Sequence, residues 1–248
     1  MRIARLKYVH SDPLFAYSGL DPISVSNNDS IKLLLEGAVD VAFVPVTYAS
    51  MHCDQLIMIP AYAIYSRGPV ISARLFKGLG KGYAAVEDTS VNALALSKLM
   101  GIKFDRVSDP IEALNRYEGV LAIGDQALRM VDRGYRHIVD VGELWEMRVG
   151  KPLVYAIMVL RRSINYDDDE LRNVLSAISK SLDTFMKDPE PLIRNVATRL
   201  GVSESLVRDY LMRGIRYIVD ELVIEGLSVE LSIFELPNCL QALDLGYY

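Results

Sequence analysis

The strongest constraint on the fold of this chain is the alternation of short apolar runs with helical patterns, which is clearest between residues 120 and 160. An apolar run at 120–123 ends in Gly124 and Asp125, and a helical pattern follows over 125–132. A glycine at such a corner lets the backbone approach a ligand closely, and a helix N-terminus offers unpaired N–H groups to an anion. This segment therefore predicts a ligand-facing turn in an α/β fold.

The same alternation covers the first two thirds of the chain, and the rest is almost entirely helix-patterned from Asp168 onward. Predicted strands lie at 3–8, 39–44, 61–65, 70–76, 83–86, 120–123, 137–141 and 153–161, and predicted helices at 30–36, 90–99 and 125–132. Two long strands, 70–76 and 153–160, bracket the middle αβ units. We therefore expect an α/β protein with an inserted lobe, 76–154, a discontinuous lobe formed by 1–75 plus 155–248, and a central cleft between them, the two strands serving as the hinge.

Composition limits the possible partners. The chain has 248 residues, is 51% hydrophobic and carries a formal net charge of -5. These values indicate a globular protein and argue against nucleic-acid binding, but a local pocket can still attract an anion. No apolar run approaches the ~20 residues of a membrane span, and no apolar leader is visible at the N-terminus. We expect a cytoplasmic protein with Cys53 and Cys239 as free thiols, although one disulfide is arithmetically possible.

Three motifs, by their order and spacing, carry a family resemblance. They are IGDQAL at 123–128, VGELW at 141–145 and VGKPLVYA at 149–156. The chain resembles the chorismate dehydratase family of the futalosine pathway of menaquinone biosynthesis, which carries Ile-Gly-Asp-x-Ala-Leu, Leu-Gly-x-x-Trp and Thr-Gly-Leu-Pro-Phe-Val-Phe-Ala. The resemblance implies a two-lobed periplasmic-binding-protein-like fold of type II. It also implies a carbon–oxygen lyase that eliminates water from chorismate to give 3-[(1-carboxyvinyl)oxy]benzoate. No cofactor or metal is implied, and the expected partner is a small anionic dicarboxylate bound by a monomer or homodimer.

The loop after the first strand supplies the candidate catalytic residue, His10, where the family has Asn. A cleft histidine hydrogen-bonds a carboxylate or acts as a base near neutral pH; the alternative is a solvent-facing loop residue. The candidates for substrate binding lie at strand ends and helix starts: Tyr8, Ser11, Thr47, Arg67, Gly68, Ser72, Ser90, Asn92, Gly124 and Asp125. Each has a structural alternative. Arg67 is either a carboxylate clamp or a solvated surface residue, and Ser90 and Asp125 are either ligand-facing or helix caps.

Several positions depart from the family pattern. Asn92 and Ala93 replace Thr and Ser, and Val46 lies where the family usually has a nearby serine. Together with His10, these changes favour a second hypothesis, a non-catalytic or diverged protein that binds a small carboxylate.

Other motifs are absent or weak. The three histidines, His10, His52 and His137, lack metal-ligand spacing, and no phosphate loop or serine-hydrolase elbow is found. Residues 195–211 resemble a helix-turn-helix. However, acidic residues in the would-be reading helix and the negative net charge argue against DNA binding.

Overall fold

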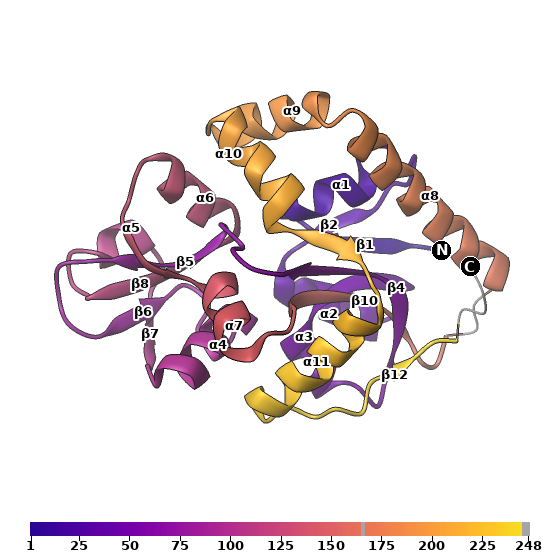
Figure 1. Ribbon diagram of the computed structural model, residues 1–248. Helices are drawn as coiled ribbons and strands as arrows, with labels where there is room; N and C mark the ends of the chain where they lie inside the picture. Colours follow the sequence, from indigo (N-terminus) through magenta and orange to yellow (C-terminus); the bar gives the residue numbers. More distant parts are fainter. Residues whose placement is uncertain (165–166, 245–248) are drawn as a thin grey trace.

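The computed structural model describes residues 1–164 and 167–244 and arranges them around two β-sheets that lie side by side (Figure 1). The larger sheet has the order β11-β4-β10-β3-β1-β2, with β12 beside β4. Its strands are β1 (Ile3–Leu6), β2 (Ile23–Val25), β3 (Val41–Pro45), β4 (Leu56–Ser66), β10 (Leu153–Arg161), β11 (Arg216–Ile218) and β12 (Gln241–Ala242). β1 pairs in parallel with β2 and β3, whereas β10 is antiparallel to β3 and β4.

The smaller sheet has the order β7-β6-β8-β5-β9. Its strands are β5 (Ala73–Lys77), β6 (Tyr83–Ala85), β7 (Phe104–Arg106), β8 (Gly119–Ile123) and β9 (His137–Asp140), and its helices are α4 (Val91–Met100), α5 (Pro110–Ala113), α6 (Gly124–Asp132) and α7 (Val141–Val149). The strand–helix alternation read from the sequence is thus confirmed in this part of the chain.

The remaining helices belong to the larger sheet. They are the short turn η1 (Val9–Ser11), α1 (Asp12–Phe15), α2 (Asn27–Leu35), α3 (Val46–Met51), α8 (Asp168–Lys187), α9 (Glu190–Leu200), α10 (Glu204–Asp209), the π-helical turn η2 (Tyr210–Gly214) and α11 (Glu221–Phe234). In Figure 1, α8, α9 and α10 arch over the side of the sheet that carries α1, while α2, α3 and α11 lie on the other side. Within the described ranges, no helix is both long and apolar enough to cross a membrane.

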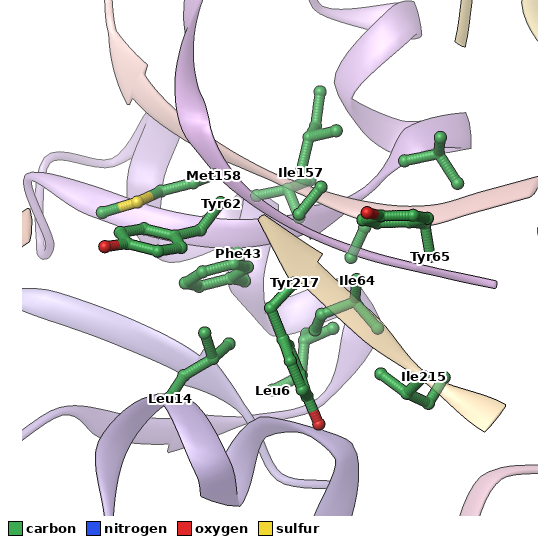
Figure 2. Packing of buried hydrophobic residues seen from close by; sticks show 14 of the residues in the cluster. Leu6, Leu14, Phe43, Tyr62, Ile64, Tyr65, Ile157, Met158, Ile215 and Tyr217 are labelled. Carbon is green, nitrogen blue, oxygen red and sulfur yellow. The ribbon is translucent and has the colours of Figure 1, made fainter. Parts of the chain in front are cut away.

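Apolar residues on neighbouring strands build the core of the larger sheet. Figure 2 shows Phe43 of β3, Ile64 of β4 and Ile157 of β10 packed together with Tyr217 of β11. All four are buried, and Phe43 and Ile64 are fully inaccessible to solvent. A contiguous core of this kind removes apolar area from water and fixes the strand ends that carry the neighbouring loops.

The strand predicted at 70–76 is confirmed over residues 73–76, but residues 70–72 are not part of it and the strand does not form the crossing that was expected. β5 covers Ala73–Lys77 and lies wholly in the smaller sheet, so it does not cross between the sheets. The crossing segment is the linker 67–72, in which Ile71 has a φ of 66°. The N–H groups of Val70 and Ile71 donate to the Asp140 carboxylate at 2.9 and 2.8 Å instead of joining a ladder. This tertiary contact overrides the β propensity of the apolar run.

The expectation of two free thiols is also wrong. Cys53 and Cys239 form a disulfide with a Cα–Cα distance of 5.4 Å, in the usual range for such bridges. The bridge joins the turn after α3 to the segment that follows α11. It therefore holds β12 close to β4, with which Gln241 and Ala242 pair.

Candidate functional site

A cavity lies where the loops of the two sheets meet. Its free volume is about 70 Å³, well below the roughly 300–1,000 Å³ typical of small-molecule sites. Residues from η1, α3, α4, α6, the linker 67–72, β10 and η2 line it. The lining includes these residues that the sequence predicted: Tyr8, His10, Thr47, Ser72, Ser90, Asn92 and Gly124.

The other predicted binding residues lie outside this lining. Ser11 is fully buried, and its hydroxyl has no hydrogen-bond partner among the described residues. Arg67 is exposed, and Gly68 forms a turn with a φ of 93°. Asp125 lines an adjoining hollow with Lys7 and Arg129, and this hollow shares Tyr8, Glu87 and Ile123 with the cavity. Their roles in binding remain predictions.

The Gly124 corner joins the two sheets. Gly124 has a φ of 61°, and a Cβ at this position would lie 3.1 Å from Cδ1 of Tyr8. Its N–H donates to the Ser72 carbonyl at 2.7 Å, and the next residue, Asp125, accepts from the Val9 N–H at 3.2 Å. A side chain at position 124 would separate these loops. The predicted need for glycine at this corner is thus explained by a left-handed backbone and a close approach.

His10 lies in η1 at the end of the first strand. Its Nε2 is buried and has no hydrogen-bond partner within the described part of the chain. Burial, and secondarily the positive charge of Arg5, lower the pKa of His10 to about 3. The imidazole is therefore neutral at neutral pH in the ligand-free protein. It offers a hydrogen-bonding nitrogen to the cavity rather than a positive charge.

The start of α4 carries two predicted residues. Ser90 is the N-cap: its hydroxyl accepts from the Ala93 N–H at 3.3 Å and donates to the Glu87 carbonyl at 2.8 Å. The capping alternative therefore holds, while the residue also lines the cavity. Asn92 is 9% exposed and leaves its Oδ1 without a partner in residues 1–164 and 167–244. Val46 and Ala93, two of the departures from the family pattern, are buried and do not line the cavity.

Sequence reasoning missed several polar residues of the lining. They are Asn27, Tyr48, Glu87, Thr89, Tyr155 and Tyr210. Glu87 accepts from Asn27 Nδ2 at 2.9 Å and from the Tyr8 hydroxyl at 3.4 Å. Its position just after β6 is a signal that was available, because the other loop candidates also follow strands. None of the three tyrosines in this set was singled out from the sequence as a site residue.

The electrostatics of the cavity are unusual for an anion site. Among its described lining residues there is one carboxylate, Glu87, and no lysine or arginine. Burial, and then the charge of Glu87, raise the pKa of Tyr8 well above its usual value. The Tyr155 hydroxyl hydrogen-bonds the Ser66 hydroxyl at 2.7 Å, and burial raises its pKa as well. The cavity thus offers neutral donors and no fixed cation.

A buried carboxylate organises the backbone behind the cavity. Asp140 is 2% exposed. Its Oδ1 caps α7 through the N–H groups of Gly142 and Glu143 at 3.1 and 3.3 Å, and Oδ2 accepts from Arg74 Nε at 3.2 Å. Together with the two linker N–H groups described above, these bonds fix the segment that delivers Ser72 to the cavity wall.

Comparisons with known proteins agree with this architecture. A family model described as menaquinone biosynthesis matches residues 1–232. Chorismate dehydratase of Thermus thermophilus is 27% identical over 231 residues, which is 83% of this chain and 83% of that protein. The alkanesulfonate-binding protein of Xanthomonas axonopodis pv. citri, solved with MOPS, has a TM-score of 0.70 at 13% identity and covers 97% of this chain and 95% of its own.

A Candida albicans protein described as having the generic periplasmic binding protein fold has a TM-score of 0.69 at 12% identity, covering 95% of this chain and 90% of its own. The predicted periplasmic-binding-protein-like fold is therefore confirmed.

Proposed function

The chain belongs to the menaquinone-biosynthesis family, whose model matches residues 1–232, and from this premise we propose that it is a chorismate dehydratase. The proposed reaction is the elimination of water from chorismate to give 3-[(1-carboxyvinyl)oxy]benzoate. The observation that carries the proposal is the cavity at the junction of the two sheets. There Gly124 of the family motif meets Tyr8, and the lining includes His10, Asn92 and Tyr210, each with a buried polar atom that lacks a well-formed hydrogen bond among the described residues.

The dicarboxylate would be held by neutral donors. Ser72 and Ser90 line the cavity beside the N-terminus of α4, whose dipole favours a negative charge. Asn92 supplies an amide on the first turn of the same helix. Because the described lining residues include no lysine or arginine, binding would depend on hydrogen bonds, which are stronger where the closed site excludes water.

The elimination balances without a cofactor. The C3–H bond breaks, its electron pair forms a ring double bond, and the C4–O bond breaks as the hydroxyl leaves as water after gaining a proton. The resulting aromatic ring supplies much of the driving force. The low pKa of His10, about 3, makes it a weak base in the ligand-free site. We therefore assign His10 to orienting the substrate, with the substrate's own carboxylate as the proton acceptor.

Substrate entry would require the two sheets to separate. A free volume of about 70 Å³ is too small for a cyclic dicarboxylate. We propose two lobes, 1–75 plus 155–248 and 76–154, that open and close around the cavity. We also propose a cytoplasmic location, because a biosynthetic enzyme has to meet its metabolite where that metabolite is made.

The test is turnover by the purified protein. Chorismate is incubated with the parent, His10→Asn and His10→Ala, and the aromatic product is followed by absorbance and chromatography. We expect product from the parent and from His10→Asn, which restores the family residue, and at least tenfold less from His10→Ala. Binding of chorismate without any product from the parent would instead indicate a carboxylate-binding protein. Equal turnover by all three forms would remove His10 from the site.

A further inference from the structure

Tyr210 is a buried residue whose hydroxyl group is incompletely bonded within the protein. It opens the π-helical turn η2, is 1% exposed, and lines the cavity. Its hydroxyl makes no hydrogen bond of normal geometry with the described residues, although the Ser72 side chain is near enough to lower its pKa as a hydrogen-bond partner would. A buried hydroxyl without a partner weakens the folded state, because water hydrates it in the unfolded chain. When such a hydroxyl belongs to a residue that lines a cavity, a bound ligand can supply the missing hydrogen bond.

The turn that carries Tyr210 is held tightly. Gly214 ends η2, and a Cβ there would lie 3.0 Å from the Val70 carbonyl oxygen and 3.3 Å from Cδ2 of Tyr210. The tyrosine ring is thus packed beside the linker 67–72, the segment that also presents Ser72. π-Helical turns are rare and often occur at functional sites. The backbone therefore places this hydroxyl on the cavity wall in a fixed orientation.

The local chemistry makes the hydroxyl a hydrogen-bond donor. Burial raises the pKa of Tyr210, while hydrogen bonding of long geometry with the side chain of Ser72 lowers it. The phenol therefore keeps its proton at neutral pH. Two more unpartnered polar atoms of the lining, His10 Nε2 and Asn92 Oδ1, come from other elements. A ligand that carries both oxygen acceptors and a hydroxyl donor would satisfy all three, because the Tyr210 hydroxyl donates whereas Asn92 Oδ1 can only accept.

We propose that Tyr210 binds the ligand directly, its hydroxyl donating a hydrogen bond to a carboxylate oxygen of the substrate beside Ser72. The inference rests on the proposed function for the identity of that substrate. It assigns a binding role to the helical C-terminal region, which otherwise serves to cover the larger sheet. The interaction is made in the ground state and in the transition state alike, so it contributes to binding rather than to the chemical step.

The chain contains a matched control. Tyr217 of β11 is 8% exposed and also has a buried hydroxyl without a partner among the described residues. Unlike Tyr210, it does not line the cavity and lies in the core cluster drawn in Figure 2. Tyr210→Phe and Tyr217→Phe remove the same atom from the same kind of environment. Only the first removes it from the cavity.

The experiment measures binding by titration calorimetry with two probes, chorismate and 3-hydroxybenzoate, together with the melting temperature of each ligand-free protein. We expect Tyr210→Phe to lose affinity about 10- to 100-fold, as for a hydrogen bond to a charged group. Tyr217→Phe should stay within about twofold of the parent, and neither variant should melt lower than the parent. If the parent turns chorismate over, KM should rise in Tyr210→Phe with little change in kcat.

The outcomes separate this inference from the proposed function. If the parent binds 3-hydroxybenzoate but not chorismate, and Tyr210→Phe alone loses binding, the dehydratase proposal fails and the role of Tyr210 stands. If the parent binds a probe and Tyr210→Phe binds it equally well, the role of Tyr210 is overturned. Equal losses in both variants, or a parent that binds neither carboxylate, overturn it as well.

Discussion

The two sides of the junction between the sheets are built differently. On the linker side, the buried Asp140 holds 67–72 and the start of α7 through hydrogen bonds of 2.8–3.3 Å. On the opposite side, which we call the mouth, the contacts between the two sheets' elements are half-buried or exposed. Glu87 accepts from Tyr8 at 3.4 Å, and Asp132 of α6 accepts from the Ser203 N–H at 3.0 Å. From this contrast we expect the junction to be firmly held on the linker side and to separate more readily at the mouth.

The largest expected effect on stability comes from removing the hydrogen bonds of Asp140 on the linker side. Asp140→Ala leaves the N–H groups of Val70 and Ile71 buried without an acceptor. We expect a loss of unfolding free energy of about 3–5 kcal/mol, measured by urea unfolding. The matched change on the mouth side, Asp132→Ala, should cost far less. Equal losses of unfolding free energy in Asp140→Ala and Asp132→Ala would contradict the proposed difference between the linker side and the mouth side.

A second expected effect on the linker side is that the folding stability depends on pH through Glu230. Glu230 of α11 is fully buried; Oε2 accepts from the Val154 N–H at 2.8 Å, and Oε1 has no partner within the described ranges. Burial raises the pKa of Glu230 well above its usual value of 4.5. The folded protein therefore keeps a proton that the unfolded chain releases. Its contribution to stability is complete below pH 4.5 and is lost as the pH rises toward the folded pKa.

Glu230→Gln should flatten this dependence, because an amide does not titrate. Urea unfolding at pH 5, 7 and 9 should show the parent losing up to about 1.4 kcal/mol per pH unit in this window relative to the variant. A parent and variant with parallel profiles would show that Glu230 does not hold its proton.

At the mouth, Glu87 allows a test of how charge affects ligand affinity. Glu87→Gln keeps an oxygen that can accept from Tyr8 or Asn27 but removes the carboxylate charge from a cavity meant for an anion. We expect affinity for chorismate to rise by up to about tenfold, a change of about 1.4 kcal/mol. Added salt should improve binding by the parent more than by the variant. Weaker binding by Glu87→Gln would mean that the carboxylate charge of Glu87 favours chorismate binding.

The smallest expected effect on stability is that of Asp132→Ala. Its carboxylate bonds Ser203 at an exposed site between α6 and the start of α10. Stability should change by less than about 1 kcal/mol, whereas the ligand-free protein should open more readily. Small-angle scattering should then show a larger radius of gyration than for the parent. An unchanged radius would mean that this contact does not hold the mouth closed.

Sequence patterns predicted the parts of the site that depend on local chemistry. Gly124 was identified because a strand–helix corner needs a left-handed residue, and Ser90 because serine caps helices. The start of β5 was placed three residues too early, at Val70 instead of Ala73. The reason is that the N–H groups of Val70 and Ile71 bond Asp140, which is 70 positions from Val70 in the sequence. Tyr210 was missed because an aromatic residue in a helical stretch has the same pattern whether it fills a core or a cavity wall. Such features depend on tertiary neighbours that no local pattern encodes.

The bridge between Cys53 and Cys239 gives the chain the covalent connectivity of a ring. The two cysteines are 186 positions apart, so the smaller sheet, the linker and all helices from α4 to α11 lie inside the closed loop. A protease that cuts any one turn within this loop leaves both fragments joined. A singly cut molecule would therefore migrate as one band without reductant and as two bands with it. Damage that would divide an open chain would leave this one as a single covalent unit.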